Sequence, residues 1–297
     1  SGRGSTSLVF TGSLSNITHA LNTGLIVTPD HDFSGIVSII VLVDDLGNTG
    51  TGTTTTEKTT SVTVTAVADV PSVVVPDVSG NESVFFDLGV VAAVTDPSEV
   101  LVDMVVSNVP VGASLSSGVN NGDGSWTITS GSNINSVQFK GVDYIAATYN
   151  LTVVVTCKEP NDSQASTTKH LLVTVDPVPT PPSSVAPTSV SGDEDTITSM
   201  ACSASLVDVD GSEVLGVHLT GVPGGSVIGG SDAVYLGNGN YSLDISKLAF
   251  LTITPPINDD SDFVVSLASF STELETGDVA WTIKDINVVV SAVADPC

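Results

Sequence analysis

The feature that most constrains this chain is a strand-like segment that occurs three times and ends each time in aspartate, with proline close behind. The three copies end at Asp69, Asp176 and Asp295, so that consecutive copies lie 107 and 119 residues apart. A fixed period of this kind is typical of tandem repeats. By comparison with the two full repeats, the first copy lacks roughly its first 40 residues, which is expected of a piece of a longer repeat array.

Alternating apolar and polar residues within each repeat predict strands of half-buried sheets. The predicted strands are 36–43, 61–67, 101–106, 151–156, 171–175, 215–219, 263–267 and 286–290. Asn-Gly dipeptides at 121–122 and 238–239 predict hairpin turns, because both residue types tolerate positive φ. Apolar spacing predicts one short helical turn at 14–21, with a counterpart at 245–248.

A repeat of about 110 residues with about seven strands has the size of an immunoglobulin-like or cadherin-like domain. The sequence therefore predicts an all-β chain of tandem Greek-key β-sandwich repeats in an elongated array. We assign the C-terminal part of a truncated repeat to residues 1–69, a second repeat to 70–176 and a third to 188–297. Residues 177–187 are rich in proline and are predicted to be an extended, semi-rigid linker.

The charge of the chain excludes two classes of partner. With 33 Asp and Glu against 7 Lys and Arg, the net charge is −26. Nucleic acids and anionic membrane surfaces carry the same sign and repel such a chain. No apolar stretch reaches the roughly 20 residues that cross a bilayer. Self-repulsion of this size opposes a compact state unless cations screen it, although acidic surfaces also keep extracellular proteins dispersed.

Five motifs carry a family resemblance: LVFTGSLSNI (8–17), TPDHDFSG (28–35), DLGNTGTG (45–52), SGDEDT (191–196) and DVDGSE (208–213). Together they resemble the cadherin-like repeats of giant bacterial RTX-type surface adhesins. The resemblance implies an extender region whose repeats stack end to end and are stiffened by calcium at or near the junctions. The cysteines, the proline-rich segment and the fewer acidic residues of the second repeat depart from that family. They leave open a eukaryotic relative, such as an axial protein of a surface filament.

The acidic motifs of the third repeat have the composition of a calcium site. Calcium takes about six to eight oxygen ligands, and the loops at one end of a β-sandwich can supply them. An EF-hand is excluded, because Leu219 stands where its last glutamate is required. The predicted calcium ligands are Asp193, Glu194, Asp195, Asp208, Asp210 and Glu213, with Asp176 completing the site from the preceding repeat. A solvated acidic turn is the alternative.

Two other acidic groups are weaker candidates for a metal site. The second repeat offers only Asn81, Glu82, Asp96 and Glu99, with Pro97 and Ser98 in place of the Asp-Gly pair of the third repeat. A third group at 259–262 is predicted to be a polar turn, because aspartate is a common turn former.

The sequence contains no recognisable catalytic constellation, so no enzymatic activity is expected. The four histidines are scattered over three repeats, and no nucleophile elbow, phosphate loop or zinc spacing occurs. Three widely separated cysteines do not form a disulfide framework. Buried thiols, a Cys157–Cys202 bridge and an intermolecular bond through Cys297, placed at the next repeat junction, all stay open.

We therefore predict a stalk, extender or filament-scaffold segment of a long extracellular protein at the cell surface. Its predicted partners are the neighbouring repeats of the same chain and other chains of a surface filament. The alternative is an adhesive module that binds a copy of itself or a carbohydrate. A carbohydrate site requires exposed aromatic residues, and Trp126, beside a hairpin turn, is the candidate among the two tryptophans.

Overall fold

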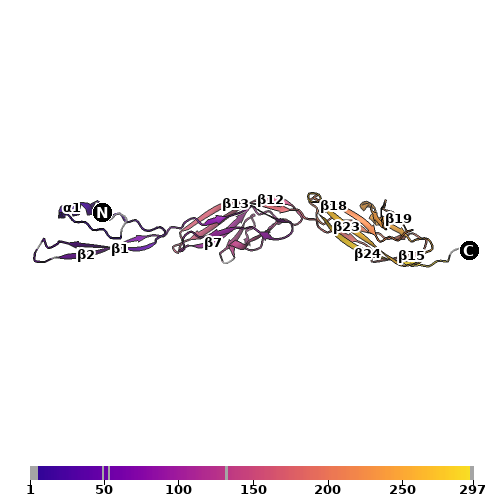
Figure 1. Ribbon diagram of the computed structural model, residues 1–297, viewed down its shortest axis with the longest axis horizontal. Coiled ribbons are helices and arrows are strands. Elements are labelled where there is room, and N and C mark those ends of the chain that lie inside the picture. Colours follow the sequence, from indigo (N-terminus) through magenta and orange to yellow (C-terminus); the bar gives the residue numbers. More distant parts are fainter. Residues whose placement is uncertain (1–5, 49, 53, 131–132, 295–297) are drawn as a thin grey trace. The chain divides into compact units, whose positions relative to one another are not determined.

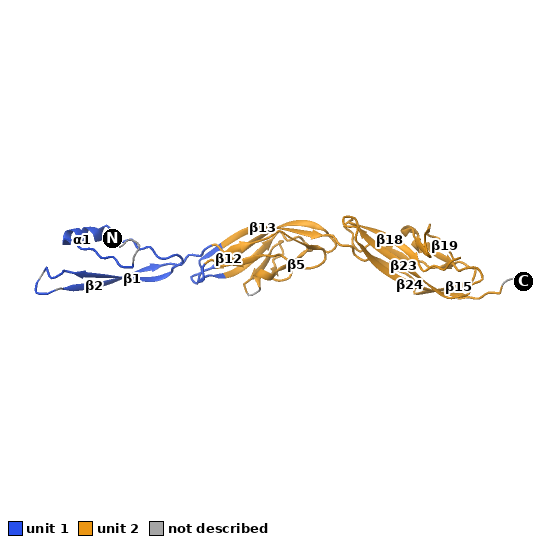
Figure 2. Ribbon diagram, in the orientation of Figure 1, with its two compact units in different colours: residues 1–69, 96–100, 158–165 blue, residues 70–95, 101–157, 166–297 orange. Residues whose placement is uncertain are grey.

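The computed structural model describes residues 6–48, 50–52, 54–130 and 133–294, and these residues form strands with little helix (Figure 1). Two compact units are distinguished (Figure 2). The first comprises residues 1–69, 96–100 and 158–165, and the second comprises 70–95, 101–157 and 166–297. No helix in the described part of the chain is long and apolar enough to cross a membrane.

The second repeat is a β-sandwich. Its larger sheet has the strand order β4–β13–β12–β7–β10–β9, its smaller sheet the order β5–β11–β8, and β3 pairs with β6. The elements are β3 (Ser72–Val74), β4 (Val78–Asn81), β5 (Phe86–Asp87), β6 (Val91–Ala93), β7 (Val100–Ser107), β8 (Ser114–Leu115), β9 (Val119–Asn120), β10 (Trp126–Thr129), η1 (Ile134–Ser136), β11 (Gln138–Lys140), β12 (Ala147–Lys158) and β13 (Gln164–Asp176).

The third repeat has the same topology. Its larger sheet runs β15–β24–β23–β18–β21–β20, its smaller sheet runs β16–β22–β19, and β14 pairs with β17. The elements are β14 (Ser183–Val185), β15 (Ser189–Asp193), β16 (Thr198–Ser199), β17 (Ser203–Ser205), β18 (Glu213–Thr220), β19 (Val227–Gly229), β20 (Val234–Gly237), β21 (Asn240–Ser242), η2 (Ile245–Phe250), β22 (Thr252–Thr254), β23 (Phe263–Glu273) and β24 (Val279–Ser291). The predicted fold class of tandem β-sandwiches is confirmed.

Each sandwich closes around alternate residues of its two longest strands. In β12 the side chains of Leu151, Val153 and Val155 are fully buried, and their neighbours in sequence face the other side of the sheet. Phe139 from the smaller sheet fills the space opposite and is also fully buried. The core forms because β-branched and leucine side chains recur with the period of two that a strand requires.

The second strand of each sandwich lies parallel to its last strand. β4 pairs with the end of β13 through four register pairs, from Val78 opposite Val173 to Asn81 opposite Asp176. β15 pairs with β24 through five, from Ser189 opposite Asn287 to Asp193 opposite Ser291. This pairing brings the entry and exit segments of one repeat together at the same edge of its larger sheet.

The first unit contains α1 (Leu14–Asn22) and a hairpin of β1 (Gly35–Asp44) with β2 (Thr55–Val64). Ser13 caps the helix by accepting a hydrogen bond from the Asn16 backbone N–H, so the helical turn predicted at 14–21 is confirmed. Its counterpart in the third repeat, η2, is confirmed as well. In β1 the side chains of Ile40 and Leu42 are more than half exposed.

The proline-rich segment 177–187, predicted to be a linker, contains a strand of the third sandwich. β14 pairs with β17 in the same way that β3 pairs with β6 in the second repeat. Thr167 donates to the carbonyl of Pro71, and Thr282 donates in the same way to the carbonyl of Pro182, each at 2.7 Å. The proline-rich segment therefore makes the same contacts with the third sandwich that the short segment after Asp69 makes with the second.

Two of the three cysteines, Cys157 and Cys202, lie among the described residues. Cys157 and Cys202 are both buried and lie in different sandwiches, which excludes a bridge between them. Burial raises the pKa of the Cys202 thiol to about 11, so this thiol stays protonated and unreactive at neutral pH. Cys297, together with the repeat ending at Asp295, lies outside the described residues.

Two glycines of the third repeat give a matched test of this packing. Both have positive φ, +78° at Gly230 and +99° at Gly237, but a Cβ at Gly230 would lie 1.7 Å from the Phe250 carbonyl oxygen, whereas Gly237 faces open space. We expect Gly230→Ala to lower the stability of the third repeat by about 1–3 kcal/mol more than Gly237→Ala does. Calorimetric unfolding of the full chain measures this difference, and equal effects would contradict the packing.

Candidate metal centres

The acidic residues of each sandwich are divided between its two ends. In the third sandwich Glu213 begins β18 and lies opposite Glu273, the last residue of β23. Asp193 lies opposite Ser291, beside the first residues of β23. With a rise of about 3.4 Å per residue, the two ends of β23 are about 30 Å apart. The acidic residues 193–195 and 208–213 therefore belong to different ends of the sandwich.

A compact acidic cluster in the second unit joins the end of the second sandwich to the start of the third. Carboxylate oxygens of Glu82, Asp208 and Asp210 all lie within 4.8 Å of one another. Glu213 and Glu273 are buried beside them and act on the same carboxylates electrostatically. We call these five residues the second cluster.

One oxygen of each buried carboxylate in the second cluster is held by a backbone N–H. Glu82 Oε1 accepts from Val178 at 2.9 Å, and Asp208 Oδ1 accepts from Asp210 at 3.0 Å. Glu213 Oε1 accepts from Thr180. These bonds fix the side chains and tie the connecting segment to both sandwiches.

The other oxygen of each carboxylate is buried without a hydrogen-bond partner. This holds for one oxygen each of Glu82, Asp208, Glu213 and Glu273, whose side chains are between 1% and 6% exposed. A buried charged oxygen without a partner costs about 1–3 kcal/mol or more. Among the described residues, no lysine or arginine forms an ion pair with this cluster. The cluster therefore has an excess of negative charge and lone pairs that no basic side chain of the described residues offsets.

The raised pKa values of three carboxyl groups in the second cluster reflect the same excess of negative charge. Burial, together with the neighbouring charges of Asp208, Asp210 and Glu273, raises the pKa of Glu82 to about 6, although the hydrogen bond from Val178 lowers it. Burial also raises the pKa of Asp208 and of Glu213. A raised pKa means that the surroundings disfavour the ionised carboxylate. A bound divalent cation would favour the ionised form and lower these pKa values.

The donor set fits calcium better than other metals. Every side chain of the cluster offers a hard carboxylate oxygen, and neither sulfur nor imidazole takes part. The unpartnered oxygens are already buried and held close together, so a cation would need little rearrangement. Magnesium fits less well, because it requires near-ideal octahedral geometry and keeps several waters.

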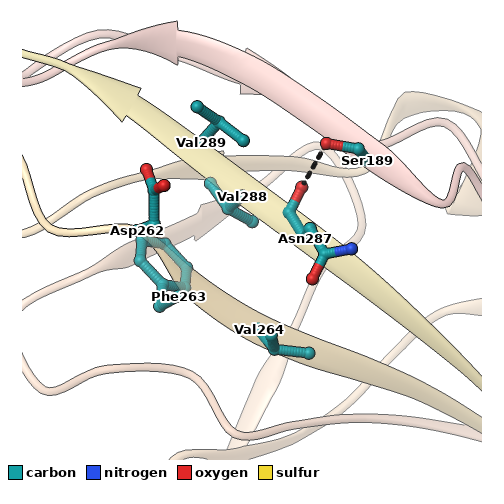
Figure 3. A pocket seen from close by; sticks show the side chains of 7 residues that line it. All are labelled: Ser189, Asp262, Phe263, Val264, Asn287, Val288 and Val289. Carbon is teal, nitrogen blue, oxygen red and sulfur yellow. Dashed lines mark hydrogen bonds between the residues drawn. The ribbon is translucent and has the colours of Figure 1, made fainter.

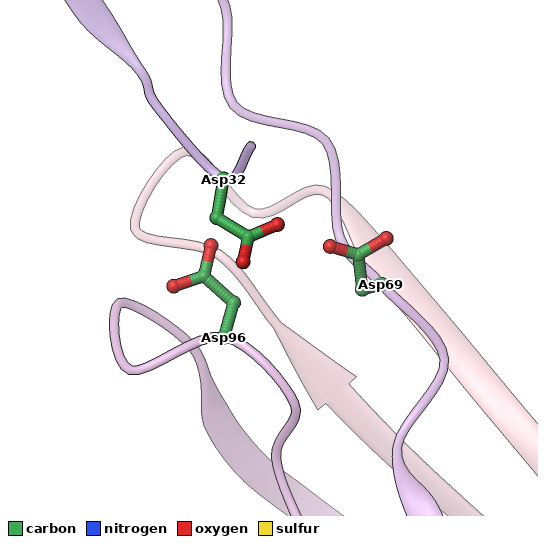
Figure 4. Close-up of side chains that lie close together, drawn as sticks. All are labelled: Asp32, Asp69 and Asp96. Carbon is green, nitrogen blue, oxygen red and sulfur yellow. The ribbon is translucent and has the colours of Figure 1, made fainter. Parts of the chain in front are cut away.

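A related cluster lies in the first unit. Oxygens of Asp32, Asp69 and Asp96 lie within 4.8 Å of one another, and the three side chains come together from three separate segments (Figure 4). Glu99 Oε1 accepts from the Asp69 backbone N–H, while its buried Oε2 has no partner. Glu159 is 3% exposed in the same unit. These residues form the first cluster.

The two clusters are built from equivalent positions. Asp96 and Asp208 each accept a hydrogen bond from the backbone N–H two residues ahead, and Glu99 and Glu213 each accept from the incoming chain. The difference is Ser98, which stands where the third repeat has Asp210. Its hydroxyl donates to both oxygens of Glu159, at 3.3 and 3.1 Å. The first cluster thus has a neutral donor in place of one carboxylate.

The structure divides the predicted site residues between two places. Asp208, Asp210 and Glu213 lie in one cluster with Glu82, whereas Asp193, Glu194 and Asp195 lie at the other end of the third sandwich. Glu194 Oε1 accepts from the Val293 backbone N–H at 2.7 Å, and Asp195 Oδ1 accepts from Asn258 at 3.0 Å. Glu194 has the same role at its end of the third sandwich that Glu82 has in the second.

The repeat endings are equivalent in a register that differs from the predicted one. Because Glu99 accepts from Asp69 and Glu213 accepts from Thr180, Thr180 takes the place of Asp69. Asp176 lies four residues earlier, opposite Asn81, and its carbonyl accepts from the Glu82 backbone N–H at 3.0 Å. The sequence alignment instead matched Asp69 with Asp176, because each is an aspartate with a proline close behind it. The structurally equivalent residue, Thr180, lies four residues later.

Some residues of the clusters had only a weak signal in the sequence. Glu273 ends the inward-facing row of β23, after Val265, Leu267 and two buried serines. A charged residue at an inward position of an apolar row is rare unless it is paired, and this pattern could have identified it. Asp32 belongs to the motif TPDHDFSG (28–35), whose sequence alone does not mark it as a metal ligand.

No family model matches the chain, and no curated protein matches it. Solved structures similar to it include mouse cadherin-23 EC22–24, at 16% identity and a TM-score of 0.36, covering 90% of this chain and 78% of that one. Protocadherin gamma B2 domains 3–6 show 13% identity and a TM-score of 0.32, covering 86% of this chain and 57% of that one. The D00–D0 domain of intimin shows 16% identity and a TM-score of 0.27, covering 74% and 99%.

These neighbours are cadherin extracellular domains and a domain of intimin, and similarities this low do not assign a function to the chain. What the chain can bind therefore rests on the chemistry of its own clusters.

The raised pKa of Glu82 predicts a pH dependence whose sign depends on calcium. Its folded value of about 6 exceeds the ordinary 4.5, so without a cation stability falls as pH rises through this window. In chelator, lowering the pH from about 7.5 to about 5 should raise the melting temperature of the second unit. With calcium the same change should lower it, because protons displace the metal.

Calorimetry of the full chain in EDTA and in calcium measures both slopes. Glu82→Gln should reduce the response in chelator, whereas Asp260→Asn, at an exposed position, should leave it unchanged. Slopes of the same sign under both conditions would contradict the assignment.

Proposed function

We propose that this chain is a structural extender segment of a long extracellular protein at the cell surface, and that calcium bound in its two acidic clusters stiffens it. The observation that carries the proposal is the set of buried carboxylate oxygens without partners, found where consecutive repeats meet in the chain. Surface acidity for solubility alone does not require carboxylates to be buried, and it gives no reason for their equivalent positions.

Calcium in the second cluster would be held by Glu82, Asp208, Asp210, Glu213 and Glu273. Because Glu82 belongs to the second repeat and the others to the third, one ion would join two repeats through charge. The backbone bonds to Val178 and Thr180 would hold the connecting segment in the same place. Asp176, near Glu82 at the end of β13, stays a predicted further ligand.

The first cluster would bind calcium through Asp32, Asp69, Asp96 and Glu99. Ser98 stands in place of Asp210, but Asp69 stands in place of the neutral Thr180, so each cluster contains five carboxylates. Calcium affinity depends on the number of charged ligands. Asp193, Glu194 and Asp195 stay predicted ligands at the far end of the third sandwich. In a longer array, Glu194 would act there as Glu82 does in the second cluster.

A bacterial RTX-type adhesin or a filament protein of a eukaryotic surface is the proposed setting. The proposal is supported by the sequence motifs of the repeats and by the tandem sandwiches. In such a setting the partners of the segment are the neighbouring repeats and the other chains of a filament.

Calcium removal should weaken the third repeat most. A ligand present at 100 times its dissociation constant stabilises the folded form by about 2.7 kcal/mol, and we expect a gain of this order on adding calcium. Asp208→Asn with Asp210→Asn should abolish most of it. Asp259→Asn with Asp260→Asn changes the net charge equally in the loop before β23, at the other end of the sandwich, and is the control. Calorimetry and calcium titration of the full chain measure the effect, and an unchanged melting temperature on chelation would contradict the site.

Calcium should also restrict movement between the second and third repeats. We expect small-angle scattering of the full chain to show a narrower distribution of maximum dimensions in calcium than in chelator. Glu82→Gln with Glu213→Gln should give the broad distribution under both conditions, because it removes ligands from both repeats. If the distribution stays the same with and without calcium, packing and the prolines alone determine the stiffness.

A further inference from the structure

The outer face of the larger sheet in the third sandwich carries three adjoining rings. Gly216, Phe270 and Trp281 are register neighbours across β18, β23 and β24. The ring centroids of Phe270 and Trp281 are 4.5 Å apart with planes inclined by 38°, and His218 lies 4.9 Å from Phe270. Trp281 is 48% exposed. An aromatic surface of this kind is uncommon in a chain that is only 5% aromatic.

The rings are held in place by the absence of a side chain at Gly216. A Cβ there would lie 2.2 Å from Cζ of Phe270, so the phenyl ring lies directly over the glycine backbone. Trp281 then packs against Phe270 and keeps much of its indole exposed. The aromatic surface is therefore ordered before any ligand arrives, which lowers the entropic cost of binding.

The aromatic surface continues into a track along β23 and β24. Alternate residues of β24 on this face are Trp281, Ile283, Asp285 and Asn287. Asp285 Oδ1 accepts a hydrogen bond from the Ser266 hydroxyl at 2.7 Å. Six residues of strand span about 20 Å, so the track has the length of a chain-like ligand.

The track ends at a pocket of about 390 Å³ (Figure 3). It is lined by Ser189, Asp262, Phe263, Val264, Asn287, Val288 and Val289. Val264, Asn287 and Val289 lie on the same outer face as Trp281. The track thus has aromatic rings at one end, polar groups along its middle and a pocket at the other end. This arrangement suits the binding of an extended amphipathic molecule.

The charge of the track selects a neutral ligand. The residues after Asp176 include 16 acidic and 2 basic side chains, a net charge of −14. Between Trp281 and Asn287 this face carries only one carboxylate, that of Asp285, which is already hydrogen-bonded. The surrounding acidic surface would repel an anionic polymer, whereas an uncharged polymer meets neither repulsion nor a desolvated charge.

The size of the surface disfavours a protein partner. A stable protein interface uses about 20 to 30 residues a side, whereas the apolar side chains of this face are those of Val214, Val264, Phe270, Val279, Trp281, Ile283 and Val289. Exposed aromatic rings on which a flat molecule can stack, flanked by hydroxyl and amide groups, suit a sugar ring. Its C–H face packs on the rings while its hydroxyls bind the polar groups.

We propose that this outer face of the third sandwich is a binding site for a neutral polysaccharide, with Trp281 and Phe270 as the stacking platform and Ser266, Asp285 and Asn287 as hydrogen-bonding groups. The site is separate from the metal clusters and does not depend on them. Trp126, the tryptophan favoured by the sequence, is half-buried and packs against the core of the second sandwich.

The second sandwich provides an internal comparison. Thr167 and Thr282 make equivalent bonds to prolines, so Ser166 takes the place of Trp281. The fold accepts serine at this position. Trp281→Ser therefore removes the platform with a residue that the same strand already carries in the other repeat.

The test uses the full chain in calcium on native gels that contain galactomannan, mixed-linkage β-glucan, arabinoxylan, dextran or, as the acidic polymer, polygalacturonate. We expect at least one neutral polymer to retard the chain and polygalacturonate not to do so. Trp281→Ser should weaken binding of a hexasaccharide of that polymer more than tenfold in calorimetric titration. Trp126→Phe, which keeps the core filled, should bind as the original chain does.

Three results would overturn the proposal. They are no retardation by any neutral polymer of the panel, equal retardation of Trp281→Ser, and a concentration-dependent dimer that Trp281→Ser abolishes in sedimentation. The melting temperature of each variant shows whether it is folded. If Trp281→Ser does not fold, Trp281→Thr, with a residue favoured in strands, replaces it.

Discussion

The organisation of this chain depends on the repulsion between carboxylates that the fold has buried. Four carboxylate oxygens of the second cluster have neither a basic partner nor a hydrogen-bond donor. A protein normally avoids this by exposing acidic residues or by pairing them. Here backbone N–H groups hold the carboxylates in place, so they cannot turn away to solvent. Such an arrangement favours either protonation of a carboxyl group or binding of a cation. Calcium bound as proposed would link the cohesion of the repeats to the composition of the surrounding medium.

Much of the fold could be predicted because its information is local. The period of two in segments such as 151–156 determines which side chains face inward, and the Asn-Gly pair at 238–239 adopts the positive φ values that a tight hairpin needs. The recurrence of these patterns then indicated the number of repeats. The structure of the proline-rich segment 177–187 was harder to predict. Its proline content suggested a spacer, whereas the pairing of β14 with β17 depends on residues about twenty positions away in the sequence.

The clusters could be predicted only in part, since they depend on which end of a sandwich a loop occupies. Asp208, Asp210 and Glu213 form one motif in the sequence and stay together in the structure. Glu194 and Asp208 are close in sequence, yet the chain crosses the length of the sandwich between them. Glu82 and Asp208 are separated by more than a hundred residues and meet because β13 returns the chain to the end at which β4 finishes.

The parallel pairing of the second and last strands affects how each sandwich responds to force. When a chain of such repeats is pulled, the load enters a sandwich through its short first strand, passes to the second strand and leaves after the last. In the third repeat the second and last strands are β15 and β24, joined side by side over five register pairs. Tension along the chain slides the two strands past each other, so their hydrogen bonds must break together. A hairpin pulled apart at its open end would lose them one at a time. The fold thus places its strongest resistance along the axis in which a tether is loaded.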